Sequence, residues 1–244
     1  MIIVLLLYLC GKQYNTMQTL LKNLKVEIND KLYVKDPESS DLGKRILSCS
    51  IEMIYELGFE QFTFKKLGLE IKSNESSIYR YFENKHKLLL YLTSWYWSWL
   101  EYQLVLQTLS QSSPKDKLNK AIEILTQEVI QDSNFNHIDE VLLNKIVIAE
   151  YSKSYLTKEV DTENKEGYFA VYKRLVLRLK DMIEEVNSVY EYPSSLSSMI
   201  IQGALHQHFL KDHFAAITDC NDITTPTSYF LNLVDQLIIS NGKK

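Results

Sequence analysis

The sequence has little glycine, proline and cysteine: seven, four and three of its 244 residues. So few glycines leave little room for a loop that cradles phosphate, and so few helix breakers favour long helices. Cys10, Cys49 and Cys220 are far apart, odd in number and without the spacing of a metal site. We therefore expect free thiols in a reducing, cytoplasmic setting, with no metal and no cofactor.

The chain also lacks an excess of positive charge. It has 27 Lys and Arg against 31 Asp and Glu, a formal net charge of −4. This balance excludes binding to nucleic acid through bulk positive charge, so any contact with DNA must come from a local patch. Even residues 41–88 hold eight Lys and Arg against seven Asp and Glu.

No arrangement typical of an enzyme is present. The sequence shows no nucleophile beside its base and no paired carboxylates in a recognisable context. His206 and His208 are two residues apart and point to different faces of a helix, whereas His206 and His213 share a face but lie two turns apart. We interpret these histidines as surface or interface residues, and the chain as a non-enzyme.

The chain opens with an apolar run, MIIVLLLYLC, which has no Lys or Arg before it and is too short to span a bilayer. Leu9 precedes Cys10, where a lipoprotein signal needs a small residue. No membrane partner is therefore expected. Because Met17 opens a polar segment, we hypothesise that residues 1–16 precede the native start; the intact mass of the native protein tests this.

The N-terminal extension, residues 1–36, contains a candidate β-hairpin at about 23–35. Apolar residues alternate with polar ones up to Ile28 and again at Leu32 and Val34, on either side of Asn29 and Asp30. The hairpin is either a basic arm on DNA or, as we favour, a packing element. Asp36 and Pro37 then favour a helix start.

Three short helices are predicted within residues 45–88. The first buries Ile46, Leu47, Ile51, Ile54 and Tyr55 and ends at Gly58. Thr63 can cap a second helix, 64–71, and Asn74 a third, 75–82, with the next helix starting at Lys85. Two helices joined by a tight turn are the helix-turn-helix geometry, in which one helix enters a DNA groove.

This segment resembles the signature of the TetR/AcrR family of transcriptional regulators over about residues 42–92. The resemblance rests on Gly58, Thr63, Leu67 and Ile71, followed by SSIYRYF and the pair Asn84 and Lys85. It implies a homodimer with an N-terminal DNA-binding domain and a helical C-terminal domain for a small inducer. By position it implies phosphate contacts from Thr63, Ser77, Tyr79, Tyr81 and Lys85, and contacts at or near base edges from Ser76 and Arg80.

Three residues depart from the family pattern. Lys72 replaces the glycine usual in the turn, so a non-glycine residue is expected to adopt a left-handed conformation there. Gly68 stands where alanine is usual and weakens the second helix slightly. Glu75 falls where the family often has lysine, and its carboxylate repels nearby phosphate.

Beyond Lys85 the sequence predicts helices at about 85–109, 115–131, 138–151, 162–189, 194–215 and 226–240, with no strand pattern. The predicted fold is therefore all-α: a helix-turn-helix domain at 37–88 and a helical effector-binding and dimerisation domain at 89–244. The boundary near residue 88 falls within or beside a continuous helix, a rigid joint that could pass a change in shape to the DNA-reading helices.

Two sets of residues in the second domain could serve a function or could simply pack within the subunit. Tyr91, Trp95, Trp99 and Tyr102 could line a ligand pocket, although we favour packing in the core. The last two helices are expected to form a dimer surface through apolar and small residues; the alternative is packing within the subunit. These residues are Leu196, Met199, Ile200, Gly203, Ala204, Phe230, Val234 and Leu237.

Taken with the resemblance, these patterns predict a sequence-specific DNA-binding regulator. We expect a homodimeric, ligand-responsive repressor on a double-stranded, palindromic operator, released by a small-molecule effector. The alternative is a helical ligand-binding or protein-interaction module that keeps the fold without specific DNA binding.

Overall fold

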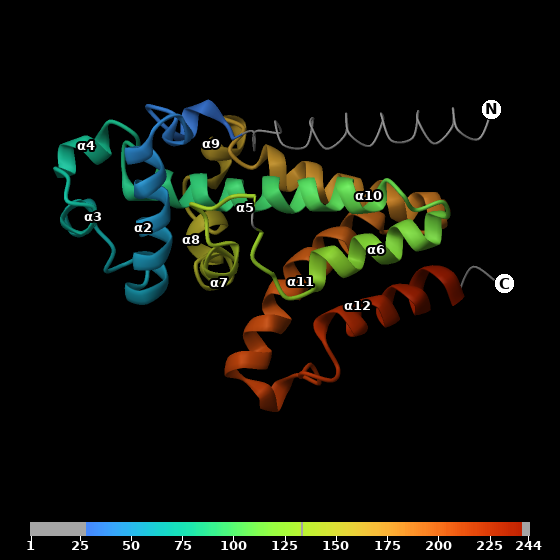
Figure 1. The fold of residues 1–244 in the computed structure, drawn as a ribbon. Helices are drawn as coiled ribbons and strands as arrows, with labels where there is room; N and C mark the ends of the chain where they lie inside the picture. The colour runs from blue at the N-terminus through green and yellow to red at the C-terminus, as the bar shows by residue number, and fades with distance from the viewer. Residues whose placement is uncertain (1–27, 133, 241–244) are drawn as a thin grey trace, which may run out of the picture.

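The computed structural model describes residues 28–132 and 134–240, and these form helices without a single strand. Figure 1 shows α2, α3 and α4 at one end of the molecule and α6, α10 and α12 toward the other, while α11 runs from that side back toward the middle. The predicted all-α fold is confirmed. The helices are α2 (Asp41–Leu57), α3 (Phe64–Glu70), α4 (Glu75–Tyr79), α5 (Lys85–Thr108), α6 (Pro114–Thr126), α7 (Glu140–Ala149), α8 (Tyr151–Tyr155), α9 (Val160–Lys165), α10 (Ala170–Val186), α11 (Pro193–His213) and α12 (Pro226–Val234).

Short helical turns complete the described chain: 3-10 turns η1 (Asp30–Leu32), η2 (Pro37–Ser39) and η3 (Ala215–Ile217), and a π-helical segment at Asp235–Ser240. Among the described residues, none of these helices has the length and apolar character needed to cross a membrane.

Side-chain caps set most of the helix starts at the end of the molecule that carries α3 and α4. Ser40, Thr63 and Asn84 each accept a hydrogen bond from a backbone amide in the first turn of α2, α3 and α5, respectively. The predicted cap at Thr63 is confirmed. The predicted cap at Asn74 is wrong, because Asn74 precedes α4 but its side chain makes no capping hydrogen bond.

Helix α5 is the axis of the fold. Every residue from Leu88 to Glu101 is buried, and the helix packs against α6, α7, α8 and α10. Trp95 and Trp97 are each only 1% exposed. A helix covered on all sides is a core element, and α5 carries this core through residue 88, where we expected the two domains to meet.

Two predicted helices are divided. The stretch predicted at 162–189 separates into α9 and α10 because Gly167 has a left-handed φ of 85° and ends the first helical run. The helix predicted at 138–151 begins at Glu140 and ends at Ala149, and α8 follows after Glu150.

The predicted hairpin is wrong over the part that the structure describes. The Asn29 side chain accepts a hydrogen bond from the amide of Lys31 and starts η1, and this turn replaces the expected strand. Leu32 is fully buried, so its apolar character reflects packing and not strand alternation. Residues 23–27 of the hairpin, and residues 1–16, which we hypothesised to precede the native start, lie outside the described residues.

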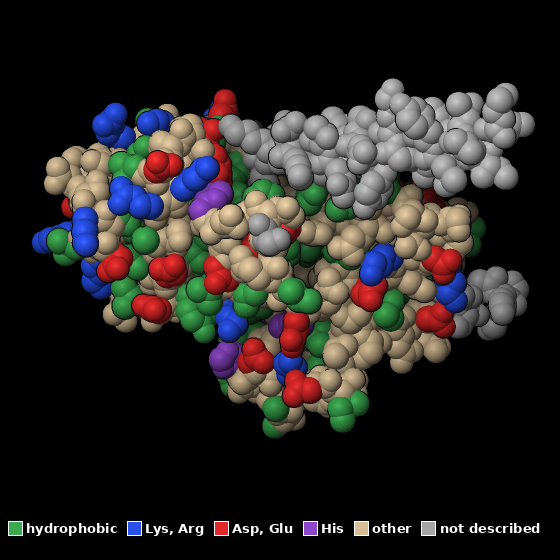
Figure 2. All heavy atoms as spheres, viewed as in Figure 1, with side chains coloured by type: hydrophobic (Ala, Val, Ile, Leu, Met, Phe, Trp, Pro, Cys, Tyr) green, Lys and Arg blue, Asp and Glu red, His purple; other side chains and the backbone are tan. Residues whose placement is uncertain are grey.

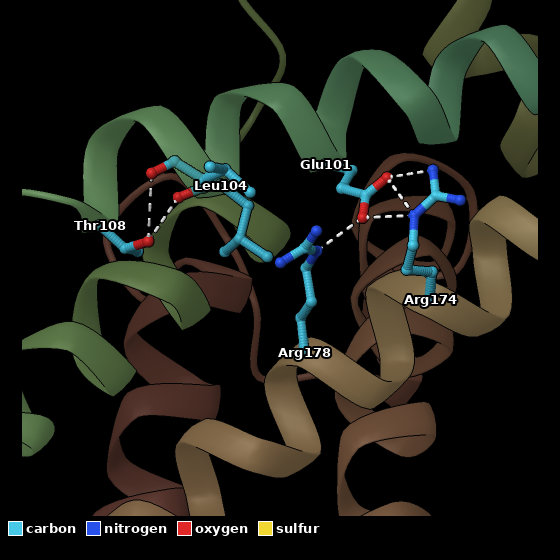
Figure 3. A network of polar contacts seen from close by, with 6 residues as sticks. Glu101, Leu104, Thr108, Arg174 and Arg178 are labelled. Atoms are coloured by element: carbon cyan, nitrogen blue, oxygen red, sulfur yellow. Dashed lines mark hydrogen bonds and ion pairs between the residues drawn. The ribbon is translucent and has the colours of Figure 1, made fainter. Parts of the chain in front are cut away.

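An ion-pair network between a buried carboxylate and two half-exposed arginines ties α5 to α10. Figure 3 shows Glu101 of α5 pointing toward Arg174 and Arg178 of α10, and the Glu101 Oε2 to Arg174 Nη2 distance is 2.6 Å. Arg178 Nε donates to Glu101 Oε1 at 2.6 Å. Burial alone would raise the pKa of Glu101, but the hydrogen bonds from the two arginines outweigh it and lower that pKa.

We therefore expect Glu101→Gln to destabilise the protein at neutral pH by about 2 kcal/mol, because charge-assisted hydrogen bonds are lost. A carboxylate with a lowered pKa stabilises the fold above its unfolded pKa, and this contribution disappears as the pH falls through the folded value. Urea unfolding at several pH values measures both effects. Equal stability of the variant and the wild type at pH 7 would contradict this account of the network.

Lys72 adopts the left-handed conformation that the sequence predicted, with φ of 52°. Replacing it by glycine should stabilise the protein by about 1 kcal/mol, because glycine adopts this backbone without a Cβ clash. Thermal unfolding measures the change. The matched control is Lys65→Gly in α3, which should lower stability by about 1 kcal/mol, since an exposed helical position gains nothing from glycine. A lower melting temperature for Lys72→Gly would contradict the expectation.

Candidate DNA-binding interface

Helices α3 and α4 form a tight helix-turn-helix. The turn between them closes on a hydrogen bond of 2.8 Å from the amide of Ser73 to the carbonyl oxygen of Gly68. A Cβ added at Gly68 would lie 2.9 Å from the Ser73 carbonyl oxygen, so glycine allows the turn to approach α3 closely. Glycine at position 68 thus lowers the helix propensity of α3, as predicted, but it also leaves the space that the turn occupies.

Apolar side chains fix the orientation of α4. Phe62, Phe64, Ile78 and Phe82 are buried between α2, α3 and α4. The ring of Tyr79 packs edge-on against Phe64, with the ring centroids 5.1 Å apart. Because Ile78 and Phe82 point into the core, the opposite side of this short helix faces outward.

The outward side of α4 carries polar side chains suited to a duplex. Ser76, Tyr79 and Arg80 are exposed, Ser77 is partly exposed, and the Tyr79 side chain remains 48% accessible. Thr63 at the start of α3 is exposed beside them. A guanidinium can bond base edges or phosphate, and hydroxyls bond phosphate oxygens.

Exposed cations surround this helix. They are Lys65, Lys66, Lys72 and Arg80, against the carboxylates Glu70, Glu75 and Glu83. Figure 2 shows Lys and Arg side chains gathered over the end of the molecule that carries α3 and α4. A chain of negative net charge thus presents a small cationic surface at this end.

Two residues assigned to phosphate by the resemblance have internal partners. Tyr81 is only 4% exposed, and its hydroxyl lies 2.8 Å from Ser40 Oγ, which gives it a packing role. The ammonium of Lys85 donates to the carbonyl oxygens of Phe59, Glu60 and Phe62 at 2.9, 3.1 and 3.2 Å. Its three protons thus hold the loop between α2 and α3 in place.

The same loop is linked to the second domain. Glu150, at the junction of α7 and α8, accepts a buried hydrogen bond of 3.1 Å from the amide of Phe59. Lys153 bridges Glu150 and Glu60 at 2.8 and 3.1 Å. A displacement of α7 would therefore reach the start of the helix-turn-helix through these few bonds.

The N-terminal extension forms a second link that sequence analysis missed. Asn29 Nδ2 donates to the carbonyl oxygen of Glu166 after α9, and the amide of Val34 donates to the carbonyl oxygen of Tyr81 at 2.8 Å. His137 lies 2.9 Å from Glu38 of η2. The extension thus spans from the end of α4 to the second domain; the capping side chains Asn29 and Asp36 were its signal in the sequence.

The predicted ligand residues divide into two pairs. Tyr91 and Trp95 lie inside the core, where Tyr91 packs on Phe82 and Trp95 on Phe135. Trp99 and Tyr102 line a hollow of about 380 Å³ between α5, α6 and the segment that follows α6. In it, Asp132 accepts hydrogen bonds from Trp99 Nε1 and Gln103 Nε2 at 3.1 and 2.9 Å.

Most of the predicted dimer residues pack within the subunit. Leu196, Ile200, Ala204, Phe230 and Val234 are at most 3% exposed. The Phe230 ring covers Gly203, where an added Cβ would meet it at 2.8 Å. Met199 remains exposed and Leu237 is partly exposed. The apolar side of α11 and α12 therefore faces the subunit core, which periodicity alone could not distinguish from a dimer face.

The histidines and thiols have separate surroundings. His208 Nε2 contacts the Thr126 carbonyl oxygen at 2.8 Å, whereas the rings of His206 and His213 flank Phe209. Within the described ranges, no cluster of His, Cys, Asp and Glu is arranged to hold a metal ion. Cys49 and Cys220 are free thiols, and Cys10 lies outside the described residues.

Comparisons with known proteins agree with this geometry. The sequence model described as "Bacterial regulatory proteins, tetR family" matches residues 46–92. A search of curated protein sequences gave no match. The structure is similar to that of AibR, solved in complex with isovaleryl coenzyme A and operator DNA, with a TM-score of 0.54, 15% identity and coverage of 80% of this chain and 98% of AibR.

Two further solved structures show the same fold. PfmR from Thermus thermophilus, a TetR family transcriptional regulator, gives a TM-score of 0.53 at 13% identity over 80% of this chain and 97% of its own. The superantigen PfiT gives 0.56 at 16% identity over 84% of this chain and 100% of its own.

The predicted resemblance is thereby confirmed where its motifs lie. The family match covers α2 to α4 and the start of α5, and the fold similarity extends over most of the chain. Residues 46–92 of this chain therefore match the tetR family of bacterial regulatory proteins, and the described chain shares its fold with AibR, PfmR and PfiT.

Proposed function

We propose that this protein is a homodimeric, ligand-responsive repressor that acts in the cytoplasm, binds a palindromic operator and has no enzymatic role. The observation that carries the proposal is the outward face of α4, with Ser76, Tyr79 and Arg80 exposed in a helix-turn-helix of tetR type. Thr63 and Ser77 are the proposed phosphate contacts beside them. AibR, which has the same fold, was solved with both an acyl coenzyme A and operator DNA, and this supports a ligand-responsive role.

The alternative is a helical interaction module without specific DNA binding. PfiT, described as a superantigen, shares the fold, so the fold alone does not determine the activity. The exposed Arg80 and the cations on α3 favour the regulator, because an interaction module has no need for a cationic surface at this end.

DNA binding is tested with DNA from the region upstream of the protein's own gene. Arg80→Ala should weaken binding about tenfold and relax sequence preference, because a guanidinium contact near a base edge contributes roughly 1–3 kcal/mol. Tyr79→Phe keeps the ring on Phe64 and should cost about fivefold, the loss of one hydrogen bond. Fluorescence anisotropy at several salt concentrations measures both.

Lys117→Ala on α6 is the control, since it removes a cation far from α4 and should leave the affinity unchanged. Lys85 is unsuitable for this test because its loss would also disturb the loop at Phe59 and Phe62. Weak, sequence-blind binding that Arg80→Ala leaves unchanged would favour the interaction module.

The proposed dimer uses the outer faces of α11 and α12. Met199, Gln202 and His206 form an exposed stripe at helical spacing on α11, and Tyr229 is exposed on α12. Met199 and Tyr229 are 47% and 44% accessible, so this face offers apolar area to a second copy. A two-fold axis through this face would present two α4 helices to a palindrome.

A charge placed on this face should separate the subunits. We expect Met199→Glu combined with Tyr229→Asp to convert the dimer to a monomer, with loss of operator binding but an unchanged helical content. Light scattering and circular dichroism measure these. The control is Leu177→Asp on α10, an equally exposed apolar position at 53% that lies on another helix and should leave the dimer intact. A dimer that survives the double substitution would place the interface elsewhere.

For the effector, we propose the hollow at Trp99 and Tyr102. Its aromatic wall offers area for an apolar group, and Gln103, Gln107 and Asp132 offer hydrogen bonds. Since α5 continues from this hollow to Lys85, a ligand there would act on the same helix that leads to the DNA-binding domain.

A further inference from the structure

A second hollow lies where the two domains meet. It has a volume of about 300 Å³ and is walled by α2 of the DNA-binding domain, by α7 and by the end of α11. Helix α7 packs against both α2 and α11, so this hollow lies at the joint and not inside the effector domain. Both its position and its walls differ from those of the hollow at Trp99.

The floor of this hollow is apolar and aromatic. Ile54 of α2, Ile146 and Ile148 of α7 and Phe209 of α11 supply the apolar area. The Phe209 ring is itself held by His213, with the ring centroids 4.7 Å apart. A flat ring is the shape that such a wall contacts with the largest area, through stacking and edge contacts.

The rim carries a cation without an ion pair in the described chain. Lys145 Nζ lies 5.3 Å from the ring centroid of Tyr55, and no carboxylate of the described residues pairs with it. Lys145 is one of the residues that line the hollow, and its charge is available to an anion. The other cation nearby, Lys153, is already bonded to Glu150 and Glu60.

The carboxylates on the same walls limit the ligand to a single negative charge. Glu150 is offset by Lys153, but Asp212 on α11 is exposed and forms no ion pair with any residue of the described chain. Asp212 would repel a dianion more strongly than a monoanion. Taken with the aromatic floor, the charges favour an aromatic monocarboxylate.

We propose that the hollow between α2, α7 and α11 binds an aromatic monocarboxylate, its ring on Phe209 and the isoleucines and its carboxylate on Lys145. Binding of the ligand at this site does not depend on the proposed function. The effect of the ligand on DNA binding does rest on that proposed function. Glu150 belongs to the same wall and holds the amide of Phe59. A ligand that separates α2 from α7 would strain this bond, so ligand and operator weaken each other's binding by the same factor.

The test uses 2-naphthoate and the full-length protein in isothermal titration calorimetry. Lys145→Met keeps the stem and removes the charge, and we expect about fivefold weaker binding, the effect of one partly exposed ion pair. Asp212→Asn removes the repulsion and should tighten binding roughly twofold. The neutral isostere 2-naphthamide should bind more weakly than 2-naphthoate and respond to neither substitution.

Gln103→Ala in the other hollow is the matched control and should leave 2-naphthoate binding unchanged. Absence of binding at millimolar 2-naphthoate, or binding that Gln103→Ala weakens and Lys145→Met does not, would overturn the proposal. A separate measurement of operator affinity with and without 2-naphthoate distinguishes the two proposals. Binding of 2-naphthoate that depends on Lys145 in a protein without operator affinity would leave this site standing and reject the repressor.

Discussion

The burial of α5 on all sides is the constraint on which the rest of the structure depends. One helix with Trp95 and Trp97 fully enclosed requires neighbours on every face, and α6, α7, α8 and α10 supply them. Since α5 begins at Lys85, directly after the helix-turn-helix, the core of the second domain and the position of α4 share one rigid element. A ligand that moves α5 or its neighbours has no flexible linker in which the motion could be lost.

Polar contacts form further links, besides α5, between the helix-turn-helix and the rest of the chain. The ammonium of Lys85 donates hydrogen bonds to three carbonyl oxygens of the loop that precedes α3. Glu150, at the junction of α7 and α8, accepts a hydrogen bond from the amide of Phe59 in the same loop. The segment from Asn29 to Ser40 joins α9 to the end of α4 on the other side. The helix-turn-helix is thus held at both of its ends by groups that belong to, or contact, the helices beyond α5, which is the arrangement that the proposed coupling between ligand and operator requires.

The sequence predicts those parts of the fold and the site that depend on residues close together in the chain. The cap at Thr63, the start of α5 at Lys85, the end of α2 at Gly58 and the left-handed Lys72 are local, and each was predicted correctly. The apolar faces of α11 and α12 were also found, but periodicity does not say whether the partner is the same subunit or another. The roles of Tyr81 and Lys85 depend on Ser40 and on three loop carbonyls distant in sequence, which no motif records.

The charge balance explains why so small a surface could serve recognition. A chain with net charge −4 is repelled from DNA at long range, so the cations on α3 and α4 act only when they are close to the duplex. Non-specific affinity, which rises with the number of phosphates neutralised, is then low. The proposed contacts at base edges from Arg80 would therefore make up a larger share of the total, and the carboxylate of Glu75 would repel phosphates placed close to it.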